Sequence, residues 1–430
     1  MTRTICNDKG FTLVEMIVVT AVLVMVIMIS GSSFNAILSN SIKLMREEES
    51  NIEGVIGLEL FRHDLEQAGY GLPWVSMNDD LDLPTYEEAA SAPHSVYNDG
   101  APFTTASARI PRAIVAGNDL PAASGANILA GTDYLAIKAT TVGRAVAAQR
   151  WTYINYSGIR ATGEVTPKPP HVMSNDNIPV DSGVIITRRE LVRSATGLEM
   201  YAPKLIYDPG DTSAANYFSQ KYPDPGAAFS DKFSPQRQEQ VYFVYGVDDN
   251  ALRMPFNRTN YYVARPADKN QIPAACRDNP NIGILYKANV NHGDGGEGGG
   301  GVTLIPILDC VADMQVVFGW NMSGDIKSGV DTYSNADGSA VSGVGTMAEI
   351  QSTMKDADLL RERLKIIKVL ILAIEGRKDK DYFSGDTIQI GDPGEANLTK
   401  IYDLKAKGIN NYRWRVYKIV ARPKNLLSNQ

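Results

Sequence analysis

Residues able to do covalent or metal chemistry are few in this chain of 430 residues. The chain has four histidines and three cysteines, Cys6, Cys276 and Cys310. So small and scattered a set leaves little material for a zinc site or for a thiol or imidazole catalyst. The patterns G-x-S-x-G, H-E-x-x-H, G-x-x-x-x-G-K-S/T and C-x-x-C do not occur in the sequence. Most hydrolase chemistries are therefore disfavoured, and we expect no enzyme and no cofactor.

One loop gathers oxygen ligands that suit a calcium ion. Residues 325–338 include Asp325, Asp331, Asn335 and Asp337 within a single stretch. Their spacing does not fit an EF-hand, which needs acidic or amide residues at alternate positions and a terminal glutamate. Asx-type turns in a solvated loop explain the same residues more simply. Calcium binding stays open here, and the sequence assigns no metal site.

A carboxylate stands in unusual surroundings near the N-terminus. Residues 1–10 form a short polar leader, and residues 11–31 supply about twenty apolar residues, the length needed to cross a bilayer. Glu15 lies inside that run, where a charge costs roughly 2.5–3.5 kcal/mol near a helix centre. A conventional secretory signal has its cleavage site after the apolar run, whereas the polar-to-apolar junction Gly10-Phe11 precedes it. The segment is therefore not an ordinary signal peptide, and Glu15 needs a partner.

The residues KGFTLVEMIVV resemble the class III signal of type IV prepilins and type II secretion pseudopilins. This resemblance implies that prepilin peptidase cuts after Gly10 and that the new N-terminal residue, Phe11, is methylated. It also implies that Glu15 pairs with the Phe11 ammonium of a neighbouring subunit, which would neutralise two charges in hydrocarbon. The alternative is a plain signal anchor in which Glu15 snorkels to the headgroups.

The compartment follows from the charges that flank the apolar run. Basic residues in the leader favour a cytoplasmic N-terminus, so we expect the rest of the chain outside the inner membrane, in an oxidising compartment. Cleavage would remove Cys6 and leave Cys276 and Cys310 as a candidate disulfide that closes a loop of about 34 residues. Two buried free thiols are the alternative. The net charge of −7, with no basic block, gives no argument for nucleic-acid binding.

A second helical segment follows the apolar run. Residues 34–69 contain no proline, and apolar residues recur at helical spacing among charged ones. These apolar positions are Ile37, Leu38, Met45, Ile52, Val55, Ile56, Leu60 and Leu65. Gly69-Tyr70-Gly71, followed by Pro73, should end the helix. We therefore predict one spine helix with a transmembrane half at 11–31 and an amphipathic half at 32–70, which packs on a head and on other subunits.

Residues 71–430 are expected to form a head of mostly antiparallel sheet, so that the whole chain is α+β. Two stretches rich in turn-forming residues, near 72–130 and 205–238, are predicted as insertions. Residues 348–363 have helical spacing. Runs of β-branched and aromatic residues predict strands at 133–142, 151–156, 183–191, 241–247, 259–265, 364–377 and 411–426. Residues 303–320 suit one or two strands, or a short helix and a strand.

The segments LELFRHDLEQAGYG, GTDYLAIKAT, NYYVAR and LIPILDCVADMQVVFGWN resemble the PilW group of type IV pilus minor pilins, the counterparts of the pseudopilin GspJ. The resemblance implies a structural subunit that primes or caps a filament by helix packing with other minor and major pilins. Prepilin peptidase, the inner-membrane assembly platform and membrane lipid are the other implied partners. The protein would sit in the inner membrane before assembly and then in the pilus. A pseudopilin of type II secretion and a membrane-anchored periplasmic enzyme are the alternatives.

Overall fold

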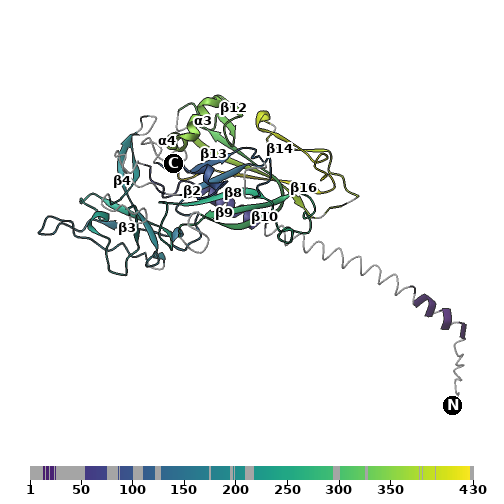
Figure 1. Cartoon of the computed structure of the whole chain (residues 1–430), viewed down its shortest axis with the longest axis horizontal. Helices are drawn as coiled ribbons and strands as arrows, with labels where there is room; N and C mark the ends of the chain where they lie inside the picture. Colours follow the sequence, from purple (N-terminus) through teal and green to yellow (C-terminus); the bar gives the residue numbers. More distant parts are fainter. Residues whose placement is uncertain are drawn as a thin grey trace, which may run out of the picture. The chain divides into compact units, whose positions relative to one another are not determined.

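The structure is a computed structural model (Figure 1). It describes residues 13–14, 16–18, 20–23, 25, 54–74, 86, 88–99, 110–121, 127–173, 176–193, 197, 199–208, 217–293, 301–324, 328–376, 378–379, 381–392 and 394–426. The chain divides into two compact units, Met1–Glu53 and Gly54–Gln430. We describe each by itself and call the second one the head.

In the first unit the described residues, at 13–14, 16–18, 20–23 and 25, are helical. The Thr20 hydroxyl donates to the carbonyl oxygens of Met16 at 2.9 Å and Ile17 at 3.0 Å, as it does inside a helix. Gly10, Phe11 and Glu15 lie outside the described residues, as do the leader and residues 26–53. Within the part that is described, no helix is both long and apolar enough to span a membrane.

The head is built on a nine-stranded sheet in which the described strands pair antiparallel. Its strands are β1 (Ile114–Gly117), β2 (Tyr134–Ala139), β8 (Asn257–Ala264), β9 (Gly283–Val290), β10 (Val302–Trp320), β11 (Thr332–Asn335), β12 (Val341–Gly343), β13 (Leu364–Glu375) and β16 (Arg413–Ala421). They run in the order β1-β2-β8-β9-β10, and β10 also pairs with β11 and β13. The prediction of a mostly antiparallel head is confirmed.

Strand β10 joins the two parts of this sheet because it is 19 residues long. Its first part pairs with β9, and its second part pairs with β13 on one side and β11 on the other. The register shifts between Leu308 and Val311, where Cys310 has a φ of 54°. The extra residues of a bulge let the ladder continue past such a shift. Residues 303–320 therefore form one bulged strand and no helix.

A second, five-stranded antiparallel sheet lies in the same unit, with the order β3-β7-β4-β5 and with β6 beside β4. Its strands are β3 (Trp151–Asn155), β4 (Gly183–Arg193), β5 (Glu199–Leu205), β6 (Ser219–Lys221) and β7 (Val241–Asp248). Alternate residues of these strands, such as Ile154, Ile186 and Val244, form a separate apolar core. Strand β6 falls within the predicted insertion at 205–238. A small hairpin, β14 (Thr387–Ile390) and β15 (Lys400–Asp403), completes the strands that the structure describes.

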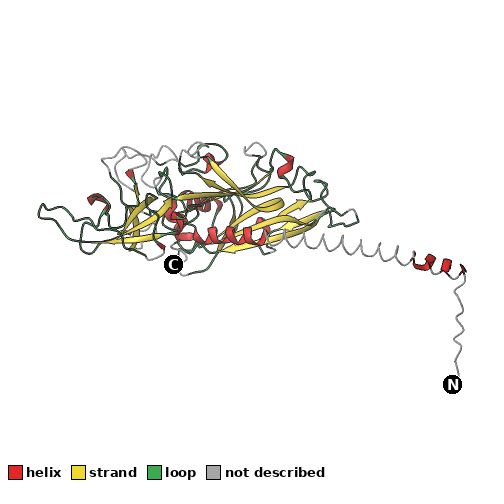
Figure 2. Ribbon diagram, turned by 90° about the horizontal axis from the view of Figure 1, so that it is seen from below, coloured by secondary structure: helices red, strands yellow, loops and turns green. Residues whose placement is uncertain are grey.

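The predicted helical stretch at 348–363 is two short helices, α3 (Met347–Lys355) and α4 (Ala357–Arg363). Asp356 separates them because its side chain accepts the backbone N–H groups of Asp358 and Leu359, which caps α4. Single turns of 3-10 helix are η1 (His94–Tyr97), η3 (Ala147–Gln149), η5 (Asp231–Phe233), η6 (Lys269–Gln271) and η7 (Ala396–Leu398). The strands and helices of the head appear in Figure 2.

Part of the stretch 72–130 lies inside the head, whereas its composition predicts a surface excursion or a small subdomain. Strand β1 belongs to the main sheet, and the segment 88–99 is held by buried ion pairs. Lys138 Nζ lies 2.8 Å from Glu88 Oε1 and 2.5 Å from Asp99 Oδ2, and Arg258 Nη1 lies 2.7 Å from Glu88 Oε2. Each of these charges has an opposite partner, which buried charges require.

Cys276 and Cys310 are bonded to each other across a sequence separation of 34, with their Cα atoms 5.6 Å apart. A disulfide commonly joins Cα atoms at this separation. Both cysteines lie in a small apolar core that includes Ile272, Leu372 and Leu404. The bond therefore ties the loop before β9 to strand β10.

Buried His292 makes the stability of the head depend on pH. Its Nε2 lies 3.0 Å from Asn257 Oδ1 and its Nδ1 accepts the Arg253 N–H at 3.3 Å, so the ring is neutral. Burial lowers the pKa of His292 from 6.5 to about 4. Between pH 6.5 and pH 4, His292 is protonated in the unfolded chain but neutral in the folded head. Protonation therefore favours the unfolded chain, and the free energy of unfolding decreases as the pH falls from 6.5 towards 4.

We expect the urea midpoint to fall between pH 7 and pH 4.5 by less in His292→Gln than in the wild type. The carboxylates lower the urea midpoint equally in both proteins. The difference between the two decreases in midpoint therefore measures the effect of protonating His292. Equal losses would show that His292 is not responsible.

Candidate assembly interface

A helix at residues 54–67 lies against the strands of the head (Figure 2). Its buried residues recur at helical spacing and form one stripe. They are Gly54, Leu58, Phe61, Asp64 and Leu65, followed by Ala68 just beyond the helix. Gly69 and Gly71 follow with φ of 86° and 69°, which stops the helix as the glycine spacing predicts. The last part of the predicted amphipathic segment therefore packs on the sheet.

An ion pair inside this stripe anchors the helix. Lys287 Nζ, from β9, lies 2.5 Å from Asp64 Oδ2, and the Tyr261 hydroxyl, from β8, donates to the same oxygen at 2.7 Å. The ring of Phe61 stacks on the Tyr261 ring with centroids 3.7 Å apart. All four side chains are buried, and this burial, reinforced by the nearby charge of Asp64, raises the pKa of Tyr261. The anchor combines charge and aromatic packing at one point.

Two glycines let the helix approach strand β10 closely. A Cβ added at Gly57 would lie 2.3 Å from the Ile307 carbonyl oxygen, and one at Gly54 would lie 2.8 Å from Leu308 Cδ1. Real Cβ atoms do not approach backbone that closely, so only glycine fits at Gly57 with the helix in this place. The pair Gly54 and Gly57 therefore belongs to the contact surface.

The opposite side of the helix is exposed and carries three apolar residues among polar ones. Val55, Ile56 and Leu60 are 60%, 66% and 38% exposed, beside the solvated charges of Glu59 and Arg62. Of the apolar positions that set the predicted helical pattern, Leu65 is buried and these three face outward. We call Val55, Ile56 and Leu60 the outer face. A helix with apolar residues on both sides can pack on the head with one side and on a further partner with the other.

The residues predicted from sequence as a processing and pairing site, Gly10, Phe11 and Glu15, lie outside the described residues. In the candidate calcium loop, Asp325 also lies outside them, and Asp331 accepts the backbone N–H groups of Met322 and Ser323. Although burial opposes the effect by raising the pKa of Asp331, these hydrogen bonds hold that pKa below its usual value. Among the described residues no group of His, Cys, Asp and Glu could hold a metal ion.

The residues that make the helix contact were not found from the sequence. Asp64 and Lys287 lie 223 positions apart, and nothing local marks them as partners. A signal was present in the helix itself, because Asp64 falls on the same stripe as Phe61 and Leu65. A lone charge on a buried helical stripe predicts an opposite charge on the facing element.

The comparisons with known proteins bear on the N-terminus. Residues 5–31 match the family model described as the prokaryotic N-terminal methylation motif. No curated protein and no solved structure matches the chain. The motif supports a type IV pilin-like or pseudopilin-like protein, and it implies processing by a prepilin peptidase and pilin partners in general. It also suggests a membrane-anchored protein that becomes associated with a pilus.

Proposed function

We propose that this chain is a minor pilin of a type IV pilus, of the PilW group, which primes or caps assembly through its helix. The observation that carries the proposal is the match of residues 5–31 to the N-terminal methylation motif. The role is structural, and we assign no reaction to the head. The protein would span the inner membrane once, with its N-terminus cytoplasmic, and then enter the pilus.

The helix at 54–67 supports this role by its two faces. The inner stripe is held to the head by the pair of Asp64 and Lys287 at 2.5 Å, so the outer face is presented on a fixed element. Val55, Ile56 and Leu60 are exposed there. Apolar helix faces associate in water because each Å² of apolar surface that becomes buried lowers the free energy by roughly 25 cal/mol. We propose that helices of neighbouring subunits pack on this face.

The proposed processing has a direct test in the N-terminal residue of the mature protein. We expect mass spectrometry to find a mature chain that begins at methylated Phe11, because the Gly10-Phe11 junction lies on the cytoplasmic side of the apolar run. Gly10→Val should leave the leader attached. A mature chain beginning at any other residue would contradict the prepilin assignment.

Glu15→Ala should leave a processed and membrane-inserted protein, because removing a charge makes insertion easier. It should lower crosslinking to other minor pilins and the number of filaments per cell, since the Phe11 ammonium of the neighbour then lacks a partner, at a cost of a few kcal/mol. Thr20→Ala, five positions further along the same apolar run, is the control and should crosslink normally. Unchanged crosslinking in Glu15→Ala would exclude the intersubunit pair.

A pseudopilin of a secretion system is the main alternative and would share the same processing. Deletion of the gene distinguishes the two. Loss of surface filaments with normal secretion supports the pilus, and loss of secretion with normal filaments supports the pseudopilin.

A further inference from the structure

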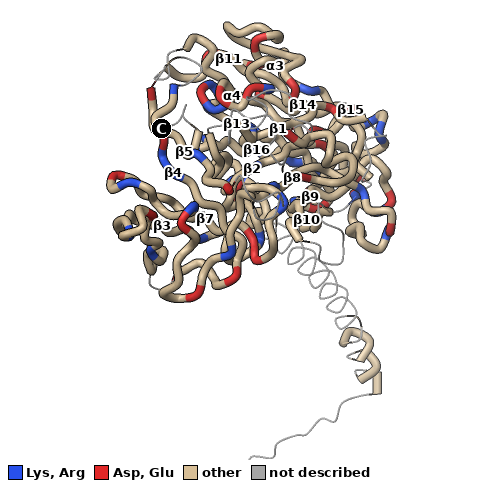
Figure 3. The backbone as a smooth tube through the Cα atoms, turned by 60° about the vertical axis from the view of Figure 1, so that its left-hand side comes forward, with Lys and Arg blue, Asp and Glu red and all other residues tan. Residues whose placement is uncertain are grey.

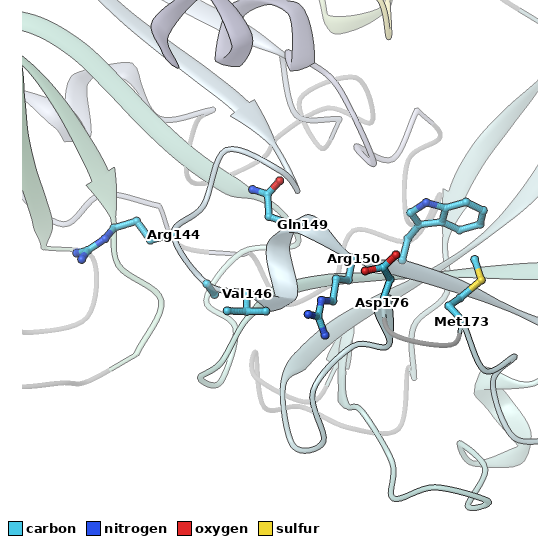
Figure 4. Close-up of a pocket in the computed structure, with 8 residues that line it drawn as sticks. Arg144, Val146, Gln149, Arg150, Met173 and Asp176 are labelled. Carbon is cyan, nitrogen blue, oxygen red and sulfur yellow. The ribbon is translucent and has the colours of Figure 1, made fainter. Parts of the chain in front are cut away.

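An open cavity of about 610 Å³ lies beside strand β3 in the second sheet (Figure 4). Its lining comes from three places: the turn η3 and the residues before it, the start of β3, and the residues Met173 and Asp176. Its main side chains are Arg144, Gln149, Arg150, Trp151, Met173 and Asp176. This volume falls in the range of small-molecule sites.

Hydrogen bonds fix the segments around the cavity. The His171 N–H donates to the Tyr153 carbonyl oxygen at 2.9 Å, and the Thr152 hydroxyl donates to the His171 carbonyl oxygen at 2.6 Å. Across the cavity, η3 packs so closely on β7 that a Cβ at Gly246 would lie 2.1 Å from the Ala147 carbonyl oxygen. The walls are therefore set by the sheet and need no ligand to bring them together.

Both hydrogen-bond donors and acceptors line the cavity. Within the described part of the chain, the guanidinium of Arg144 and the carboxylate of Asp176 have no hydrogen-bond or ion-pair partner. The Gln149 amide nitrogen donates to the Thr141 carbonyl oxygen at 2.8 Å, and Arg150 donates to the Asn177 carbonyl oxygen. These bonds orient Gln149 and Arg150. In Figure 4 the side chains of Arg150 and Asp176 lie close together, whereas Arg144 lies apart from both.

An aromatic surface completes the lining. Trp151 is 39% exposed, and its ring lies 6.3 Å from that of Phe243 on β7. Trp151 and Tyr153 share one face of β3 because side chains alternate along a strand. Tyr153 in turn stacks on His171 with centroids 4.6 Å apart. The cavity thus joins an exposed indole to the free carboxylate of Asp176 and to the N–H groups that Gln149 and Arg150 still have available.

These features select the class of ligand. Sites for phosphates and nucleic acids are dominated by cations, whereas in this lining the carboxylate of Asp176 offsets one of the two arginines. In the view of Figure 3, lysine and arginine positions are also interspersed with aspartate and glutamate positions along the backbone of the head. A purely apolar ligand would bury Arg144 and Asp176 without partners. A sugar hydroxyl both donates and accepts, and the C–H face of a sugar ring packs on an indole. We propose that this cavity binds a saccharide.

The test uses the full-length chain in a detergent whose headgroup is not a sugar, applied to an array of bacterial and host glycans. We expect at least one glycan to bind, and we expect Trp151→Ala and Asp176→Asn each to weaken that binding about tenfold or more, the cost of one lost good contact. Tyr201→Ala is the matched control, because Tyr201 is 66% exposed on β5 and does not line the cavity. It should bind as the wild type does.

Three outcomes would overturn the proposal: no glycan bound, equal binding by all four proteins, or binding confined to sulfated glycans and single-stranded DNA that disappears with added salt. The last outcome would indicate a non-specific anion surface. Circular dichroism of each variant shows that it is folded. Because binding is measured on the isolated chain, its failure leaves the proposed pilin role untouched, and failed processing at Gly10 leaves the cavity untouched.

Discussion

Lys287→Met should lower the free energy of unfolding of the head by about 3–5 kcal/mol, the usual cost of removing one partner from a buried ion pair. The reason is that Asp64, 2% exposed, would be left with only the Tyr261 hydroxyl and the half-exposed ring of His63, 3.8 Å away, as partners. Urea unfolding followed by circular dichroism measures this loss. The melting temperature should fall with it.

Arg62→Met on the same helix is the matched control. Arg62 pairs with Glu66 at 3.1 Å in solvent, with its own side chain 48% exposed, so its loss should cost less than about 1 kcal/mol. The double variant Asp64→Leu with Lys287→Met should recover most of the stability, because a buried ion pair replaced by apolar groups is often neutral. If the variants at Lys287 and Arg62 cost the same, the described anchor is not the main contact of the helix.

Gly57→Ala should destabilise the head by about 1–3 kcal/mol, the cost of overpacking a close contact. The sign of the effect is what tests the structure. In a free helix, alanine is more stable than glycine by about 1 kcal/mol, so the substitution would then be favourable. In the head, the new Cβ would lie 2.3 Å from the Ile307 carbonyl oxygen, which belongs to the backbone of β10 and cannot rotate away.

Gly54→Ala provides a graded comparison within the same helix. Its new Cβ would meet Leu308 Cδ1 at 2.8 Å, and the end of a leucine side chain can move. We therefore expect a smaller loss at Gly54 than at Gly57, measured by the same urea titration. A gain in stability at Gly57 would mean that the helix does not approach β10 as described.

The sequence alone was enough where the cause of the structure is local. A polar leader followed by an apolar run is recognised by its order along the chain, and residues 5–31 match the methylation motif. The roles of Gly10, Phe11 and Glu15 stay predictions. Strands such as β2, β7 and β13 were predicted because β-branched and aromatic residues cluster between turn residues. The end of the helix at 54–67 was predicted from Gly69, which has the φ of 86° that such an end requires.

Contacts between distant residues depended on the tertiary structure. The pairs Asp64 with Lys287 and Glu88 with Arg258 join positions that have no local signal for each other. The composition of residues 72–130 predicted a surface excursion or a small subdomain, because composition does not show that the charges of segment 88–99 meet opposite charges from β2 and β8. Similarly, Val55, Ile56 and Leu60 are apolar but exposed, while Gly54 and Asp64 are buried. Hydrophobic pattern gives the period of a helix, but the facing strand decides which side is inside, because close approach and charge pairing are properties of two surfaces together.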